Sequence, residues 1–283
     1  MKALRLFGLL SLAIATPLAA EDAPPSPSPA TIAMRWQWLN PDVNSFTFRE
    51  TDRVFEYRPV ARGEQVWQID SAPGFTMPGN YEAWAEATFT NAFLVIRDGR
   101  IVFEDYRNRM HAETPHIAFS MTKTITAMLV GQALARGEIA SLDDPVSRYV
   151  PALADGAYGR ASIRNVLEMR SGADIVERYD FGVNPSLAAR IHETAIIRNQ
   201  ARFADFAVGI GQQTEPGSTF NYATLDTAVL GWVLEEATGQ TIEALMQQRI
   251  WQGMGAEFDG HFIADGPVSN GRALNGMGFN ARL

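Results

Sequence analysis

Two residues with complementary chemistry, Ser120 and Lys123, lie three positions apart at the head of an apolar run. Lys123 is the only lysine after residue 20, and the other basic side chains there are arginines, which do not release their proton. Positions i and i+3 share a face of a helix, so the lysine amine can reach Ser120 Oγ. Desolvation of Lys123 disfavours the charged form of its amine, and the neutral amine can then accept the serine proton. The pair therefore indicates a serine nucleophile with a lysine base, against the alternative of a surface turn in which Ser120 only caps a helix.

The element that must position this pair is the segment that follows it. Residues 124–137 are apolar on nearly every face, as in a helix that is buried in a core, and Gly137 is suited to the C-terminal cap. The N-terminus of such a helix carries partial positive charge close to Ser120, where an oxyanion would develop in acyl transfer.

A β-hairpin is the clearest element before this helix. Ala92–Arg97 and Arg100–Tyr106 are apolar runs separated by Asp98-Gly99, the dipeptide that favours a two-residue type I′ turn. Residues 35–91 contain four tryptophans amid glycine and proline, and we interpret them as an irregular N-terminal extension.

Further helices are expected downstream, each marked by a serine or threonine before an apolar run. One starts within 141–145; Ser162 caps another over 163–169, Thr224 one over 225–237 and Thr241 one over 242–250. Residues 218–222 are a brief strand-like run. A hairpin followed mostly by helices is typical of an α+β fold, and its antiparallel sheet needs more strands than the sequence shows.

The N-terminus has the pattern of an export signal. Positive charge at Lys2 and Arg5, an apolar stretch over 6–15 and small residues up to Ala20 predict a signal peptide over 1–20, and hence a periplasmic or secreted protein. The apolar stretch is too short to span a membrane, and we expect no other membrane span.

Composition limits the possible functions. The 283 residues are 46% hydrophobic, which is ample for a full core. Loss of residues 1–20 removes Lys2 and Arg5 and no acid, so the net charge changes from −8 to −10. A chain this acidic, without a basic run, is a poor nucleic-acid binder. Because cysteine is absent and the four histidines are scattered, we expect neither a disulfide nor a zinc site.

Four further segments have the residues and the spacing of a known family. They are Leu142–Val146, Ile163–Gly172, Phe220–Tyr222 and Leu230–Gly231. Together with Ser-x-x-Lys they resemble the serine β-lactamase and penicillin-binding-protein hydrolases, in the class C β-lactamase and esterase branch. The likeness extends from about Arg49 to the end of the chain and is greatest to the 6-aminohexanoate-dimer hydrolases. It implies a β-lactamase/transpeptidase-like α+β fold, an antiparallel sheet with a helical domain, and acyl-enzyme chemistry without a metal or organic cofactor.

The resemblance also implies roles for individual residues. Ser120 matches the acylated nucleophile, Lys123 its base, and Tyr222 a proton relay to the leaving group. A phenol keeps its proton at neutral pH unless a positive charge or an amine lies beside it, and Lys123 would be that neighbour. Thr224 stands where β-lactam-directed members have a substrate-binding asparagine, which favours esters or linear amides as substrates. Tyr179 matches a substrate-loop tyrosine of the nylon-oligomer enzymes, or else is a surface aromatic on an acidic loop.

The end of the chain departs from the family pattern. Family members continue beyond the segment similar to Gly276–Arg282 into further strands, one of which carries a Lys-Thr-Gly-like motif and the second oxyanion-hole N–H. Neither Lys-Thr-Gly nor His-Thr-Gly occurs in this chain. We therefore expect a signal peptide over 1–20, a Pro/Ser-rich, extended and mobile segment over 21–33, and a serine hydrolase domain over 34–283 that lacks its C-terminal strands.

The expected function is that of an exported serine hydrolase acting on small-molecule carboxylic esters or linear amides. Three alternatives remain: a penicillin-binding or acyl-sensing module that is acylated without turnover, an inactive relative, and a β-lactamase or D-amino-acid peptidase. The sequence leaves the oligomeric state open.

Overall fold

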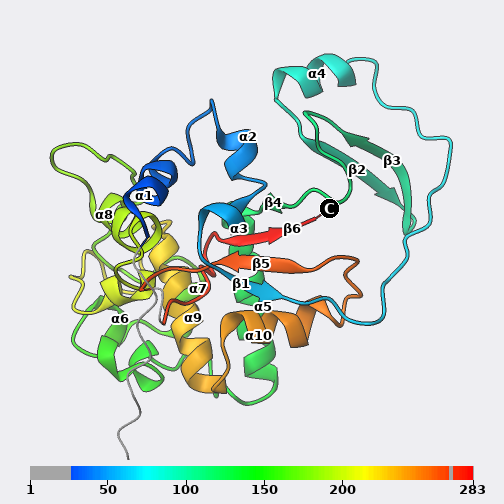
Figure 1. Cartoon of the computed structure of the whole chain (residues 1–283). Coiled ribbons are helices and arrows are strands. Elements are labelled where there is room, and N and C mark those ends of the chain that lie inside the picture. Colours follow the sequence, from blue (N-terminus) through cyan, green and yellow to red (C-terminus); the bar gives the residue numbers. More distant parts are fainter. Residues whose placement is uncertain (1–26, 268–269, 283) are drawn as a thin grey trace, which may run out of the picture.

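The structure, a computed structural model, describes residues 27–267 and 270–282. An antiparallel sheet lies against a body of helices, and a hairpin with one short helix stands to one side (Figure 1). The α+β class expected from the sequence is confirmed. The predicted signal peptide lies outside the described residues.

The central sheet has four antiparallel strands in the order β1-β5-β6-β4. They are β1 (Tyr57–Val60), β5 (Gly260–Ile263), β6 (Phe279–Ala281) and β4 (His116–Ile117). The interpretation of residues 35–91 as irregular was therefore wrong, because β1 lies within them. Arg58 and Pro59 hide this strand in the sequence, and proline is tolerated here since β1 forms an edge of the sheet.

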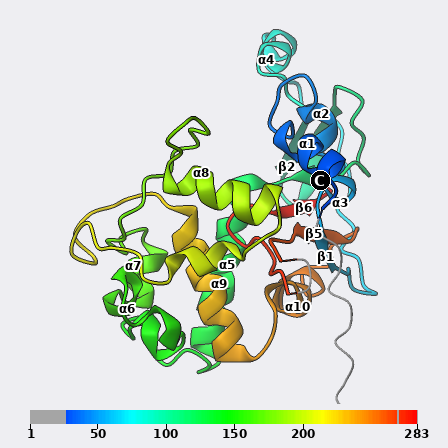
Figure 2. The same ribbon diagram turned by 60° about the vertical axis from the view of Figure 1, so that its left-hand side comes forward.

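The predicted hairpin consists of β2 (Ala92–Arg97) and β3 (Arg100–Tyr106). Its turn residues Asp98 and Gly99 have φ values of 53° and 74°, as a type I′ turn requires. One face packs against α4 (Tyr81–Ala87) through an aromatic cluster formed by Tyr81, Trp84, Phe93 and Phe103. The hairpin is separate from the four-stranded sheet, and Figures 1 and 2 show it projecting from the body.

The N-terminal helices contradict one expectation. α1 (Pro29–Trp36) begins after Ser28, so the part of segment 21–33 from Pro29 onward is helical and not extended. Proline suits the first turn of a helix because its missing N–H is not needed there. Buried Arg35 fixes α1 by donating to Val54 O (2.8 Å). The next helices are α2 (Asn44–Thr47) and α3 (Thr51–Val54).

Two long helices, α5 (Thr122–Ala135) and α9 (Thr224–Thr238), pack against each other in the middle of the helical body (Figure 2). Around them lie α6 (Ala157–Arg160), α7 (Ile163–Leu167), α8 (Leu187–Ile191) and α10 (Ile242–Met246), with 3-10 turns η2 (Val146–Arg148), η3 (Pro151–Leu153) and η5 (Phe203–Ala207). α8 and α10 continue as the π turns η4 (His192–Ile197) and η6 (Gln247–Trp251). Within the part of the chain that the structure describes, none of the helices is both long and apolar enough to cross a membrane.

α5 is buried along one side only. Leu129 and Val130 are fully buried, whereas Met121, just before the helix, and Met128 are 72% and 49% exposed. The expectation of a helix buried in the core therefore holds for one side of α5 and not for the other. The sequence of α5 has no polar stripe, because much of its exposed side is occupied by small residues and not by charged ones. These small residues include Thr124, Ala127, Gly131 and Ala135.

Most predicted helix starts lie close to the observed ones. Ser162 Oγ accepts from Asn165 N in a capping box, and Thr241 Oγ1 accepts from Ala244 N. The start expected within 141–145 is followed only by the 3-10 turn η2. Thr224 was wrongly predicted as a cap, because it is the first residue of α9 itself.

The strand-like run predicted at 218–222 is irregular in the structure. Asn221 N donates to Met169 O (2.8 Å), and Asn221 Nδ2 donates to Ile175 O (2.7 Å). The segment therefore binds loops instead of a neighbouring strand. These bonds place Tyr222 near the start of α5.

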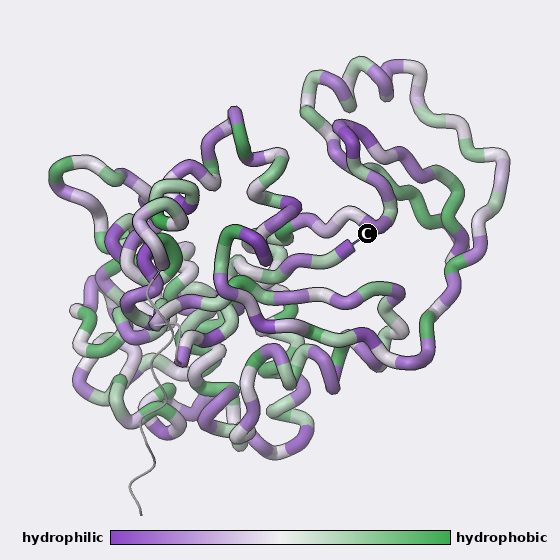
Figure 3. Tube along the Cα trace, in the orientation of Figure 1, coloured by the Kyte–Doolittle hydropathy of each residue, from purple (hydrophilic) through white to green (hydrophobic). Residues whose placement is uncertain are grey.

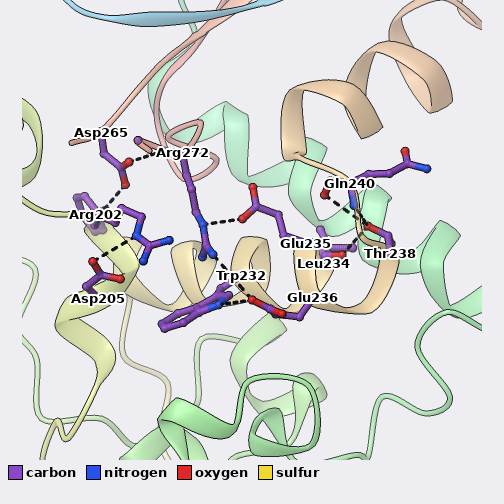
Figure 4. A network of polar contacts seen from close by, with 12 residues as sticks. Arg202, Asp205, Trp232, Leu234, Glu235, Glu236, Thr238, Gln240, Asp265 and Arg272 are labelled. Carbon is purple, nitrogen blue, oxygen red and sulfur yellow. Dashed lines mark hydrogen bonds and ion pairs between the residues drawn. The ribbon is translucent and has the colours of Figure 1, made fainter. Parts of the chain in front are cut away.

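A polar network holds the loop between β5 and β6 on α9 (Figure 4). Arg272 pairs with Glu235 (2.7 Å) and lies 5.0 Å from the ring centroid of Trp232. Asp265 accepts from Arg272 N (2.6 Å) and Phe203 N (2.7 Å). Burial raises the pKa of Asp265 to about 7, which these hydrogen bonds only partly offset. The loop that the network fixes continues into the candidate site.

Candidate active site

Ser120 lies in η1 (Phe119–Met121), a 3-10 turn between β4 and α5. Phe119 has a φ of 44°, which costs a non-glycine residue roughly 1–3 kcal/mol. Its ring contacts Phe48 (4.9 Å between centroids) and Trp38 (5.7 Å), and this packing supports the unusual backbone. The turn exposes Ser120 at the N-terminal end of α5, where the helix carries partial positive charge.

Lys123 lies within hydrogen-bonding distance of three oxygens. Its Nζ is 3.0 Å from Ser120 Oγ, 3.1 Å from Thr224 Oγ1 and 2.7 Å from Gly276 O. Glycine is needed at position 276, because a Cβ there would lie 2.8 Å from Thr224 Cγ2. The loop between β5 and β6 thus brings the Gly276 carbonyl oxygen to Lys123. A larger residue at position 276 would push this carbonyl away from the lysine.

Tyr222 completes a trio around the serine oxygen. Its hydroxyl donates to Ser120 Oγ (2.7 Å), although the two residues are 102 positions apart. Lys123 Nζ lies 5.0 Å from the centroid of the Tyr222 ring, a position in which an ammonium is attracted to the ring face. Ser120, Lys123 and Tyr222, which the sequence placed in one site, therefore lie together.

Glu177 joins this trio through Thr224. Its Oε2 accepts from Thr224 N (2.9 Å) and its Oε1 accepts from Thr224 Oγ1 (2.7 Å). The carboxylate lies at the N-terminus of α9, where negative charge is favoured. Thr224 thus contacts Lys123 on one side and Glu177 on the other.

Tyr179 is turned toward the same carboxylate. Its hydroxyl donates to Glu177 Oε1, and its ring contacts His192 edge-on, with 5.7 Å between centroids. Burial and the Glu177 charge raise the pKa of Tyr179 above its ordinary value. Tyr179 therefore keeps its phenolic proton, and its oxygen can still accept a hydrogen bond.

Ser120 lies on the wall of a pocket of about 250 Å³. His192 forms part of its wall, with Nε2 accepting from Trp38 Nε1 (3.2 Å), and burial lowers the pKa of this imidazole to about 4. The wall therefore presents a neutral ring at ordinary pH. The lining residues are Leu39, Phe119, Ser120, Glu177, Tyr179, His192, Tyr222, Thr224 and Met277.

All five residues predicted from the sequence lie at this pocket or contact the residues that line it. Glu177, His192 and the carbonyl of Gly276 also belong to the site and were not predicted from the sequence. A weak signal existed for Glu177, since it precedes Tyr179 by two residues on an acidic loop. A backbone carbonyl leaves no signal of its own in a sequence.

The fold and the site are those of the β-lactamase class of proteins, and comparison with known proteins agrees. The sequence profile of the beta-lactamase family matches residues 83–257, and the chain belongs to this family. The resemblance inferred from the motifs is thereby confirmed.

Individual relatives are hydrolases. The chain is 28% identical over 237 residues to 6-aminohexanoate-dimer hydrolase of Paenarthrobacter ureafaciens. The aligned region covers 82% of this chain and 59% of the relative. It is 32% identical over 167 residues to esterase EstB of Burkholderia gladioli, which covers 55% of this chain and 41% of the esterase. The chain therefore spans 59% or less of the length of these two relatives.

Solved structures show the same fold. A Bacillus anthracis protein provisionally assigned as a 6-aminohexanoate-dimer hydrolase aligns with a TM-score of 0.74 at 19% identity, over 87% of this chain and 67% of that one. The octameric penicillin-binding protein homologue of Pyrococcus abyssi aligns with a TM-score of 0.55 at 18% identity, over 72% of this chain and 53% of that one.

Proposed function

We propose that this protein hydrolyses carboxylic esters or linear amides through an acyl-enzyme formed on Ser120. The observation that carries the proposal is the position of Ser120 Oγ between Lys123 Nζ (3.0 Å) and the Tyr222 hydroxyl (2.7 Å), on the wall of a pocket. A nucleophile within reach of two proton carriers has the arrangement that acyl transfer needs.

In the first half-reaction, Ser120 Oγ bonds to the substrate carbonyl carbon while its proton passes to the neutral amine of Lys123. Tyr222 then protonates the leaving alcohol or amine as its bond to the carbonyl carbon breaks. The proton held by Lys123 restores the phenol. In the second half-reaction the oxygen of a water molecule bonds to the carbonyl carbon of the acyl-enzyme while one water proton passes to Lys123. The bond between that carbon and Ser120 Oγ then breaks, Ser120 Oγ takes the proton from Lys123, and the carboxylic acid is released.

The apolar part of the pocket wall favours an apolar acyl or leaving group, and the Glu177 carboxylate on the same wall disfavours an anionic one. Leu39, Phe119 and Met277 provide apolar surface, and His192 is neutral there. Thr224 is engaged with Lys123 and Glu177, so it is not free to hold a β-lactam amide as an asparagine would. The likeness to proteins named 6-aminohexanoate-dimer hydrolase and esterase EstB supports linear amides and esters as the substrate class.

The test compares kcat/KM for a short p-nitrophenyl ester and for a cephalosporin, because the ratio of the two constants measures discrimination. We expect the ester to be preferred by at least tenfold. A preference for the cephalosporin would assign the protein to β-lactam hydrolysis instead. A single stoichiometric burst of p-nitrophenol without turnover would indicate an acyl-sensing module.

We also propose that the protein is exported, on the basis of residues 1–20. N-terminal sequencing of protein recovered from the periplasm or the medium of a bacterial host should begin at Glu21. Recovery of uncleaved protein only from the cytoplasm would contradict export.

A further inference from the structure

We propose that Glu177, acting through the Thr224 hydroxyl, directs the lone pair of the Lys123 amine toward Ser120. This inference deepens the proposed function, on which it rests, and makes Glu177 a positioning residue. It explains why a carboxylate that does not contact the nucleophile lies beside the catalytic lysine.

The carboxylate of Glu177 can only accept hydrogen bonds, and its neighbours are donors. Its Oε2 faces Thr224 N (2.9 Å), and its Oε1 receives the hydroxyls of Thr224 (2.7 Å) and Tyr179. The backbone N–H of Thr224 fixes the carboxylate against α9. In this position the carboxylate also accepts a hydrogen bond from the Thr224 hydroxyl.

A threonine hydroxyl has one proton. Because Thr224 gives this proton to Glu177, only its lone pairs can face Lys123 Nζ, 3.1 Å away. The second neighbour of Nζ, Gly276 O at 2.7 Å, is a carbonyl and also accepts only. Thr224 Oγ1 and Gly276 O, two of the three neighbours of the amine, can therefore only accept a hydrogen bond from an N–H of Lys123.

A neutral amine has two N–H bonds and one lone pair. When the N–H bonds point to Thr224 Oγ1 and Gly276 O, the lone pair points to the remaining neighbour, Ser120 Oγ at 3.0 Å. This is the orientation in which the amine can take the serine proton. Without Glu177, the Thr224 hydroxyl could rotate and donate to the amine, which would occupy the lone pair.

The experiment is a double-mutant cycle with Glu177→Gln and Thr224→Val, read as the single-turnover acylation rate with a p-nitrophenyl ester. Glutamine keeps the size of the side chain, but its amide can donate to Thr224 Oγ1 and so reverse the hydroxyl. Valine removes the hydroxyl and keeps the backbone bond to Glu177. Each change should slow acylation by about tenfold to a hundredfold, part of the 10²–10⁴-fold that a positioned base contributes, with little change in KM.

Non-additivity is the critical result. If Glu177 acts through Thr224, the double variant acylates no more slowly than Thr224→Val alone. Thr224→Ser, which restores a hydroxyl, should recover most of the rate lost in Thr224→Val. Losses that multiply would show that Glu177 acts independently of Thr224, and a raised KM with an unchanged acylation rate would show that Glu177 acts on substrate binding. Either result would overturn the inference.

Two controls separate this inference from folding and from the proposed function. The acylation rates are normalised to the fraction of molecules that a fluorophosphonate labels at completion, which counts the correctly folded sites. A Glu177 variant that folds poorly is therefore not mistaken for one that acylates slowly. If Thr224→Val is folded and keeps the full rate, the inference is wrong whatever Glu177→Gln does. If wild-type protein shows no acylation that depends on Ser120, the proposed function itself has failed.

Discussion

The serine oxygen of the candidate site has two neighbours that are held differently. Lys123 Nζ is held by hydrogen bonds to Thr224 Oγ1 and Gly276 O in addition to its contact with Ser120. Tyr222, in contrast, is 39% exposed to solvent. A base must be positioned before the reaction, while a group that protonates the leaving group must reach outward to it. This difference supports Lys123 as the base and Tyr222 as the acid.

Replacing Lys123 by arginine should abolish activity as completely as replacing it by alanine. Arginine keeps the positive charge but cannot act as a base, because its guanidinium does not deprotonate in proteins. Measurement of kcat/KM for the two variants with a p-nitrophenyl ester checks this. An arginine variant with a substantial fraction of wild-type activity would exclude the role of a neutral amine.

Asp226 should make the protein less stable as the pH rises from about 4 to 7. Tyr158 OH and Ser171 Oγ donate to its Oδ1 (2.6 and 2.8 Å), but its Oδ2 is buried without a hydrogen-bond partner among the described residues. Burial raises the pKa of Asp226 from 3.8 to about 7, against the opposing effect of these hydrogen bonds. The folded state therefore binds a proton that the unfolded state has lost in this range, and the free energy of unfolding falls by up to about 1.4 kcal/mol per pH unit.

Asp226→Asn is the matched variant, because asparagine resembles the protonated acid and does not titrate. Urea unfolding at pH 5 and pH 7 should show a smaller loss of stability in this variant than in the wild type. Equal losses in both proteins would show that Asp226 does not titrate in this range.

At the scale of elements, the site depends on how α5, α9 and the loop between β5 and β6 are joined. Asn275 makes the connection: its Nδ2 donates to Thr227 O on α9 (2.6 Å), and its carbonyl oxygen accepts from Thr126 Oγ1 on α5 (2.8 Å). The next residue is Gly276, which supplies the carbonyl oxygen to Lys123. Displacement of Asn275 should therefore disturb the base.

Gly231→Ala on α9 should destabilise the protein and reduce activity. The added Cβ would lie 2.6–2.8 Å from three side-chain atoms of Asn275, and overpacking of this kind costs roughly 1–3 kcal/mol. Gly131→Ala on α5 is the control, since nothing lies within 4 Å of its Cβ and alanine stabilises a helix by about 0.5–1 kcal/mol. Thermal unfolding and kcat measure both variants, and equal behaviour would contradict this account of Asn275.

The sequence predicted those elements whose signals are local. The hairpin follows from two apolar runs on either side of Asp98-Gly99, and the pairing of Ser120 with Lys123 follows from helical spacing. β1 was missed because four residues with a proline carry little pattern. Glu177 was missed because its contact with Thr224 spans 47 positions and depends on how a loop meets a helix. Such contacts are products of tertiary packing and have no periodicity to detect.

At the scale of the whole molecule, the hairpin and the body differ in how they are supported. Apolar residues lie along the hairpin strands as well as along segments of the body (Figure 3). The hairpin has two strands, and its link to the preceding segment includes an isolated bridge between Ser71 and Ile101. A two-stranded sheet is marginally stable by itself. α9, in contrast, is buried along most of its length.

We therefore expect the amide hydrogens of β2 and β3 to exchange faster than those of α9. Local opening needs the least free energy where few buried contacts hold a segment. Hydrogen exchange followed by mass spectrometry compares peptides from 92–106 and 224–238. Equal protection of both segments would show that the hairpin is held as firmly as the body.

The proposed function requires that Ser120 is the residue that becomes acylated. The most direct measurement is peptide mass spectrometry after reaction with a fluorophosphonate, performed on the wild type and on Ser120→Ala. We expect one adduct, on the peptide that contains Ser120, and no adduct in the variant. An adduct on another serine, or undiminished labelling of Ser120→Ala, would contradict the proposed function.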